Sequence, residues 1–261
     1  MISRLSRLIA DNTSSLRDFE EIISMDPALV ARLLTVVNSA YFGLITRVDS
    51  ITRAVALLGM KNLHNIAVTD ALKRMFASGS RNSSFSRSRL WMHSAAVGIC
   101  SKMISERILA QNGDDAYLCG VLHDIGLVVE DQVVPDQFIQ AFNSWVSPEP
   151  PITVLEERLI GTNHSEIGHL LALDWLLGDE VAEAIKNHHI IAENISPDSM
   201  SGILQLAEYI VSRIDMGVKP EISAPLSPPL MDHLRENSEE YMVLTDDLHE
   251  EISKARELYA N

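Results

Sequence analysis

Apolar residues recur at helical spacing along nearly the whole chain, and this pattern limits the fold more than any other feature. One stripe includes Leu29, Leu33 and Val37, and residues 203–214 contain another. Positions three and four apart lie on one face of an α-helix, so each stripe predicts a helix with a buried face. No convincing alternation of apolar and polar residues predicts a strand. We therefore expect an all-α fold, a multi-helix bundle.

Capping residues and helix breakers divide this pattern into separate helices. Asp26-Pro27 is typical of a helix start, since aspartate caps a helix and proline fits its first turn. Gly59 follows an apolar stripe and predicts a helix end. Thr153 and Glu156 fit a capping box, in which both side chains would bind backbone groups at the start of a helix.

Composition divides the chain into three parts. Six of the eleven residues 78–88 are serines, which predicts a loop between two helical lobes. Four of the ten prolines fall within 220–229, which predicts a linker, and the acidic tail beyond it keeps helical spacing. We expect that tail to form a helix that docks on the body or on a partner. The predicted parts are a first lobe at 1–84, a second lobe at 85–218, and the linker with the C-terminal helix at 219–261.

Charge and cysteine content narrow the class of function. The 261 residues include 21 lysines and arginines against 36 acidic residues, a net charge of -15. Such a surface repels phosphate backbones, so we expect no nucleic-acid binding. Cys100 and Cys119 have apolar neighbours and are expected to be reduced core thiols of a cytoplasmic protein. No apolar run approaches the roughly 18 residues of a membrane span, and the N-terminus lacks the apolar core of a signal peptide, so no membrane association is expected.

His123 and Asp124 lie side by side within an apolar run. Burial of an ionised carboxylate costs several kcal/mol unless a partner or a metal compensates. Imidazole and carboxylate together suit divalent transition metals, and helical bundles build metal sites from facing helices. We expect one or two ions of iron, manganese, nickel or zinc, with Asp124 able to bridge two. The predicted ligands are His93, His123, Asp124, His164, His188, His189 and Glu208.

The other four histidines are expected to be surface or hydrogen-bonded core residues, because a lone histidine most often is. His169 comes nearest to being a further candidate, since it lies five residues after His164. These four residues are His64, His169, His233 and His249.

Around these candidates the chain resembles a known family. His93 followed by His123-Asp124 resembles the HD superfamily of metal-dependent phosphohydrolases, and the first half is similar to the HDOD domain. The resemblance covers about Asp11 to Asp215. It implies an N-terminal helical lobe, an HD-like lobe, and a regulatory role in bacteria through protein–protein contacts. The matching segments are Asp26-Pro27-Ala28-Leu29, Arg32-Leu33-Leu34, Asn38-Ser39-Ala40, Leu58-Gly59, Leu118-Cys119-Gly120-Val121-Leu122-His123-Asp124-Ile125-Gly126 and His164-Ser165-Glu166-Ile167-Gly168.

The resemblance also implies which residues bind metal and where the pattern departs. His93, His123 and Asp124 match the first ligands of metal-binding HD proteins. The related HD-GYP phosphodiesterases, which use two or three metals, have ligands that match His164, His188 and His189.

Three departures from the HD-GYP pattern, and one from the HD pattern, argue against cyclic-di-GMP hydrolysis. Leu127 stands where that pattern has a lysine after the HD-x-G residues. Ile190 stands where a glutamate is expected after the two histidines, and no Gly-Tyr-Pro signature follows. Glu208 takes the place of the final aspartate of the HD pattern, and its longer arm moves the carboxylate oxygens.

Two main functions follow as expectations. The first is a cytoplasmic signal-transduction module without catalysis, which keeps a metal site and binds a regulatory or signalling protein; a homodimer is left open. The alternative is a metal-dependent phosphohydrolase that acts on a nucleotide or other phosphoester, with Asp124 as its catalytic residue. The absence of a glycine-rich phosphate loop and of a basic cluster near the ligands favours the first. A metal or redox sensor, including an oxygen-binding di-iron centre, is a third alternative that no residue singles out.

Overall fold

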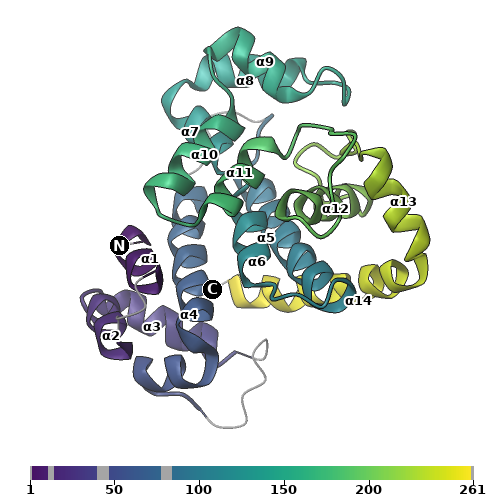
Figure 1. The fold of residues 1–261 in the computed structure, drawn as a ribbon. Coiled ribbons are helices and arrows are strands. Elements are labelled where there is room, and N and C mark those ends of the chain that lie inside the picture. Colours follow the sequence, from purple (N-terminus) through teal and green to yellow (C-terminus); the bar gives the residue numbers. More distant parts are fainter. Residues whose placement is uncertain (1, 11–14, 40–46, 78–83, 260–261) are drawn as a thin grey trace.

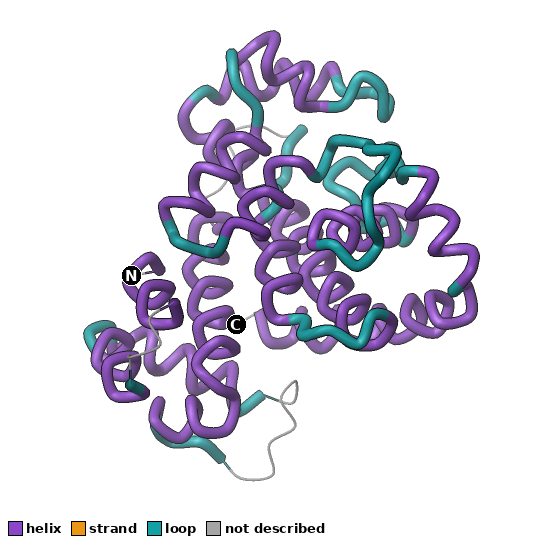
Figure 2. The backbone as a smooth tube through the Cα atoms, viewed as in Figure 1, coloured by secondary structure: helices purple, strands orange, loops and turns teal. Residues whose placement is uncertain are grey.

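The computed structural model describes residues 2–10, 15–39, 47–77 and 84–259, and within these ranges its regular secondary structure is entirely helical (Figures 1 and 2). This confirms the all-α fold. Most of the serine-rich segment, at 78–83, and Ala40 of the family resemblance lie outside the described residues. The N-terminal helices are α1 (Ile2–Ala10), α2 (Leu16–Ser24), α3 (Pro27–Val37) and α4 (Ile51–Ala77).

The remaining helices form the larger part of the molecule (Figure 1). None of the described helices is both long enough and apolar enough to cross a lipid bilayer. In chain order these helices are α5 (Arg87–Met103), the π-helical turn η1 (Ile104–Ile108), α6 (Asp114–Leu122), α7 (Ile125–Val133), α8 (Pro135–Ser144), α9 (Ile152–Ile160), α10 (His164–Asp174), α11 (Asp179–Asn187), α12 (Met200–Arg213), α13 (Pro228–Glu236) and α14 (Ser238–Tyr259).

Buried apolar side chains form two hydrophobic cores. The N-terminal core joins α1, α2 and α3 to the first part of α4 and includes Phe19 and Leu63. The larger core lies among the later helices and includes Leu122. Leu72 and Phe76, near the end of α4, also pack in this larger core. Helix α4 therefore belongs to both cores and connects them.

Local helix signals act as the sequence predicts at most of these positions. The Asp26 side chain accepts a hydrogen bond of 3.0 Å from the Leu29 N–H and caps α3. The backbone of Gly59 has a φ of 80° and breaks the helical path inside α4, as expected for a helix end. The prediction of a capping box at Thr153 and Glu156 is wrong, because α9 begins at Ile152 without a side-chain cap. Glu156 is instead fully buried and binds the start of α10.

Helices α5 and α6 approach each other closely enough to set two site residues side by side. A Cβ atom on Gly120 of α6 would lie 2.6 Å from the Cα of Gly98 on α5, so only glycine permits this contact. His93 lies on α5 and His123 follows the end of α6. The close packing therefore brings the two imidazoles together.

The C-terminal helix packs on the body of the molecule. Helix α14 contacts α5, and its apolar stripe is buried there. Pro228 begins α13, so part of the proline-rich segment is helical, and residues 217–227 before it are irregular. The buried residues of the α14 stripe are Tyr241, Leu244, Leu248, Ile252 and Ala255.

Candidate metal centre

All seven side chains predicted as ligands meet in one buried region, although they come from six helices or helix ends. His93 and Glu208 lie within α5 and α12, and the others lie at helix ends. His123 ends α6, Asp124 precedes α7, and His164 begins α10. The remaining two, which follow α11, are His188 and His189.

Asp124 lies at the centre of this cluster. Its Oδ2 atom lies 3.5 Å from Nε2 of His93 and 3.3 Å from Nε2 of His123. Its Oδ1 atom lies 3.4 Å from Nε2 of His164 and 3.6 Å from Nε2 of His188. The two carboxylate oxygens therefore face two different pairs of imidazoles, as a carboxylate that bridges two ions would.

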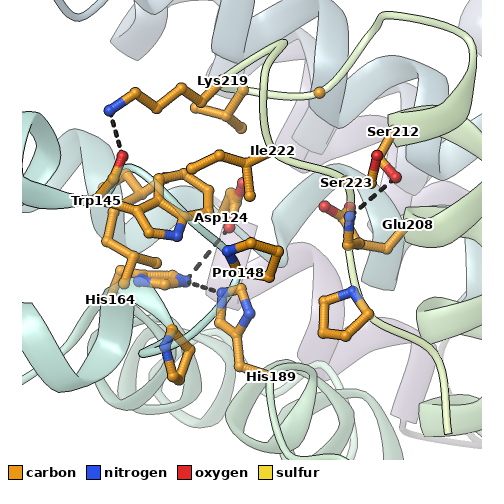
Figure 3. Close-up of a pocket in the computed structure, with 17 residues that line it drawn as sticks. Asp124, Trp145, Pro148, His164, His189, Glu208, Ser212, Lys219, Ile222 and Ser223 are labelled. Carbon is orange, nitrogen blue, oxygen red and sulfur yellow. Dashed lines mark hydrogen bonds and ion pairs between the residues drawn. The ribbon is translucent and has the colours of Figure 1, made fainter.

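One further side chain extends each half of the cluster. The Glu208 Oε2 atom lies 3.1 Å from Nε2 of His93 and 3.3 Å from Nε2 of His123. On the other side, Nε2 of His189 lies 3.0 Å from Nε2 of His164 (Figure 3). We call these the His93 group (His93, His123, Glu208 and Asp124 Oδ2) and the His164 group (His164, His188, His189 and Asp124 Oδ1).

The outer nitrogen of four imidazoles is held by an oxygen of the protein. A carbonyl or carboxylate oxygen can only accept, so each Nδ1 carries the proton and each Nε2 presents its lone pair to the cluster. Second contacts of this kind orient metal-binding histidines. The pairs are His93 with Met216 O at 2.9 Å, His123 with Gly120 O at 2.7 Å, His188 with Ile185 O at 2.6 Å, and His164 with Glu156 Oε2 at 2.7 Å.

The inner nitrogens lie so close together that they require positive charge between them. Nε2 of His93 lies 3.3 Å from Nε2 of His123, and Nε2 of His164 lies 3.3 Å from Nε2 of His188. When both Nδ1 atoms carry the protons, two lone pairs face each other in each pair. A proton or a metal cation removes this repulsion. The imidazole and carboxylate donors fit a divalent transition metal such as iron, manganese, nickel or zinc.

The electrostatics of the cluster also favour a cation. Burial opposes ionisation of Asp124, but His123, with His188 and His164, outweighs this and holds the pKa of the carboxyl well below its usual range. Burial lowers the pKa of His123, yet Asp124 and Glu208 raise it well above its ordinary value. The site therefore attracts positive charge. Burial, and then His188, lower the pKa of His189 well below its usual range and keep that imidazole neutral.

A small cavity of about 50 Å³ reaches the cluster, which is room for one or two water molecules (Figure 3). Asp124 and His189 line one side, and the irregular residues 217–225 line the other. Lys219 is the one lysine or arginine that lines this cavity in the described part of the chain. Its ammonium donates hydrogen bonds to the carbonyls of Phe142, at 2.9 Å, and of Trp145. These bonds fasten residues 217–225 to the end of α8.

The four histidines predicted to lie outside the site have other partners. His64 is buried, with Nε2 3.0 Å from the Ser6 hydroxyl. Nδ1 of His169 donates to the Ala182 carbonyl at 3.1 Å. The other two are on the C-terminal helices, His233 on α13 and His249 on α14.

Sequence reasoning missed Glu156, which holds His164 in two ways. Its Oε2 atom accepts the His164 N–H at 3.1 Å and Nδ1–H at 2.7 Å. A signal was present, because Glu156 falls midway between Ile152 and Ile160, four residues from each, on an apolar stripe. A carboxylate at a buried helical position requires a partner. The capping-box pattern of Thr153 and Glu156 predicts a different role for this residue.

The sequence model of the HDOD domain family matches residues 1–191. An uncharacterized protein of Treponema pallidum (strain Nichols) is 31% identical over 190 residues, which are 71% of this chain and 36% of that protein. The chain therefore spans little more than a third of the curated relative that it matches.

Solved structures share the fold at low sequence identity. A Marinobacter aquaeolei VT8 protein, whose name proposes signal transduction, has a TM-score of 0.76 and 22% identity, over 100% of this chain and 58% of that one. An HDOD domain protein of Geobacter sulfurreducens has a TM-score of 0.69 and 24% identity, over 95% and 91% of the chains. A Shewanella amazonensis SB2B protein, whose name proposes metal-dependent phosphohydrolase activity, has a TM-score of 0.64 and 19% identity, over 99% and 90%.

Proposed function

Because the chain belongs to the HDOD domain family, we propose that it is a regulatory signalling module whose larger core is organised around two divalent transition-metal ions. The observation that carries this proposal is the position of Asp124, whose two oxygens face the His93 group and the His164 group. Each group would hold one ion, and Asp124 would bridge them.

The first effect of the ions would be to stabilise the folded chain. The ligands come from α5, α10 and α12 and from the ends of α6 and α11, so ligation ties together helices that are distant in sequence. Metal binding contributes directly to folding free energy when the site exists only in the folded chain. A bound divalent ion can also lower the pKa of a bound water and polarise a phosphoryl oxygen.

The surroundings of the cluster favour signalling over hydrolysis. The cavity of about 50 Å³ is far smaller than the roughly 300–1,000 Å³ typical of small-molecule sites. Lys219, the cation at its edge, is bound to two backbone carbonyls. Leu127 is buried at the cavity wall and offers no charge to a phosphate. We therefore propose that the module acts in the cytoplasm through its outer surface, by binding another regulatory or signalling protein.

One observation supports a second candidate, a metal-dependent phosphohydrolase. The cavity reaches both groups, since Asp124, His164 and Glu208 line it. A phosphoester could approach the ions if residues 217–225 moved away. In that case the His93 group and the His164 group would hold the ions, whose chemistry would be to activate a water and polarise a phosphoryl oxygen.

Elemental analysis of untagged protein tests the proposal. We expect about two equivalents of transition metal in the wild type and about one in His123→Ala or His189→Ala, since each variant removes a ligand from one group. Asp124→Ala should lose both. His249→Ala on α14 is the matched control and should keep both. No metal under any loading condition would contradict the proposal, and phosphoester hydrolysis that His123→Ala abolishes would favour the second candidate.

A further inference from the structure

A second buried carboxyl group lies behind Glu156. Glu130, on α7, is 1% exposed, and Glu156, on α9, is fully buried. The Glu156 Oε2 atom is occupied by two hydrogen bonds from His164. The Glu156 Oε1 atom and both oxygens of Glu130 have no hydrogen-bond partner among the described residues. Three buried oxygens without a donor would be costly, so their arrangement requires an explanation.

The two carboxyl groups are each other's neighbours. Glu130 lies within hydrogen-bonding reach of Glu156. Burial, and then the charge of Glu156, raise the pKa of Glu130 to about 10. Two ionised carboxylates in contact repel each other strongly, and such a pair commonly shares one proton. A single proton on Glu130 would turn one of its oxygens into a donor and satisfy Glu156 Oε1, so that only the uncharged carbonyl oxygen of Glu130 would lack a donor.

We propose that Glu130 is a protonated positioning residue that donates its O–H to Glu156 and thereby holds Glu156 in place as the acceptor of His164. The resulting chain runs from the Glu130 O–H to Glu156 Oε1, and from Glu156 Oε2 to the Nδ1–H of His164. The Nε2 atom of His164 then faces Asp124 at 3.4 Å. Only this last link rests on the proposed function, because there the oriented imidazole would meet a metal.

The proton on Glu130 has two consequences for His164. It limits the buried pair to one negative charge, which the backbone N–H and the Nδ1–H of His164 stabilise by hydrogen bonds. It also occupies Oε1, so that Glu156 cannot turn that oxygen toward another donor. The orientation of the imidazole is therefore set by a carboxyl group that lies beyond its direct partner, an outer contact of the kind that supports metal ligands.

Infrared spectroscopy of metal-free protein tests the proton directly. A buried, protonated carboxylic acid has its own C=O stretching band, separate from that of carboxylates. We expect this band at neutral pH in the wild type and in Glu180→Gln, an exposed control on α11. Glu130→Gln should lose it. A wild-type spectrum without the band would overturn the proposal whether or not the protein binds metal, so this test is independent of the proposed function.

Metal titration tests the positioning role. Glu130→Gln keeps an N–H donor toward Glu156, whereas Glu130→Leu removes it at similar volume. We expect Glu130→Leu to lower the metal affinity of the His164 group about 10–100-fold, with Glu130→Gln staying close to wild type. The His93 group serves as the internal control, since Glu130 does not support it. Equal losses in both variants, or a Glu130→Leu protein that binds metal like the wild type, would contradict the role.

Discussion

Two buried carboxyl groups of the larger core are held in opposite protonation states. Burial raises the pKa of both, but at Asp124 the imidazoles of His123, His188 and His164 outweigh this and keep that carboxylate ionised. At Glu130 the next contributor is the charge of Glu156, which adds to the effect of burial. The charged side chains beside each carboxyl group therefore decide its protonation state, because burial alone would favour the protonated form of both.

The raised pKa of Glu130 predicts a pH dependence of stability. The folded chain keeps this proton up to a pKa of about 10, whereas the ordinary value is 4.5. Between these values the unfolded chain binds fewer protons, so the free energy of unfolding falls as pH rises, by at most about 1.4 kcal/mol per pH unit. Glu130→Gln does not titrate, and its free energy of unfolding should fall less steeply. Urea unfolding of both proteins between about pH 6 and pH 9 measures this; parallel curves would count against it.

For single residues, the sequence reveals polar side chains whose burial is unusual. It does not reveal residues whose role depends on a partner that is distant in the sequence. His123-Asp124 could be predicted as a site because a charged pair within an apolar run needs compensation. Glu130 also follows an apolar run, but its partner Glu156 lies 26 positions further along the chain, on α9. The sequence does not show that the fold brings these two residues together. The carbonyls that hold the imidazoles, such as Met216 O, depend entirely on tertiary structure.

Among the elements, the irregular segment before α13 contributes as much to the site as a helix does. The Met216 carbonyl holds Nδ1 of His93 at 2.9 Å. Arg89 donates to the Gly217 carbonyl at 2.9 Å, and Lys219 binds the end of α8. Its prolines predict only that regular structure is interrupted. They do not show that the backbone just before Pro220, at Met216 and Gly217, supplies hydrogen-bond acceptors to α5.

Helix α14 offers a direct test of its packing, because neighbouring residues lie on opposite faces. Leu244 is 1% exposed and Val243 is 62% exposed. Leu244→Ala should lower the free energy of unfolding by about 2–5 kcal/mol, since it leaves a cavity in the larger core. Val243→Ala should change it by no more than about 0.5 kcal/mol. Urea denaturation compares the two variants, and similar losses would mean that α14 is not docked as described.

For the whole molecule, helical periodicity was sufficient to predict the fold class, but not how the helices divide between the two cores. Leu72 and Phe76 lie within the predicted first lobe, yet they pack in the larger core. An apolar stripe shows that one face of α4 is buried, but it does not identify the helix that covers that face. The contacts of α4 with α5 and α6 decide this, and they are long-range.

Metal loading should raise the thermal stability of the whole chain. An ion present at about 100 times its Kd contributes about 2.7 kcal/mol for each site, if it binds only the folded state. For a chain of this size that corresponds to a rise in Tm of about 5–10 °C. Calorimetry of metal-free protein with and without added manganese or zinc measures the shift. Asp124→Ala should show no rise, and an equal rise in that variant would indicate binding elsewhere.

The spread of the ligands along the chain sets the order of events during synthesis. The His93 group is incomplete until Glu208 has left the ribosome, and the His164 group is incomplete until His189 has done so. Residues 217–225, which cover the cavity, emerge later still. Under the proposed function, a nascent chain must therefore keep its larger core soluble without ions. Metal acquisition then comes after Glu208 has emerged, so only a product that extends past this residue can complete both groups.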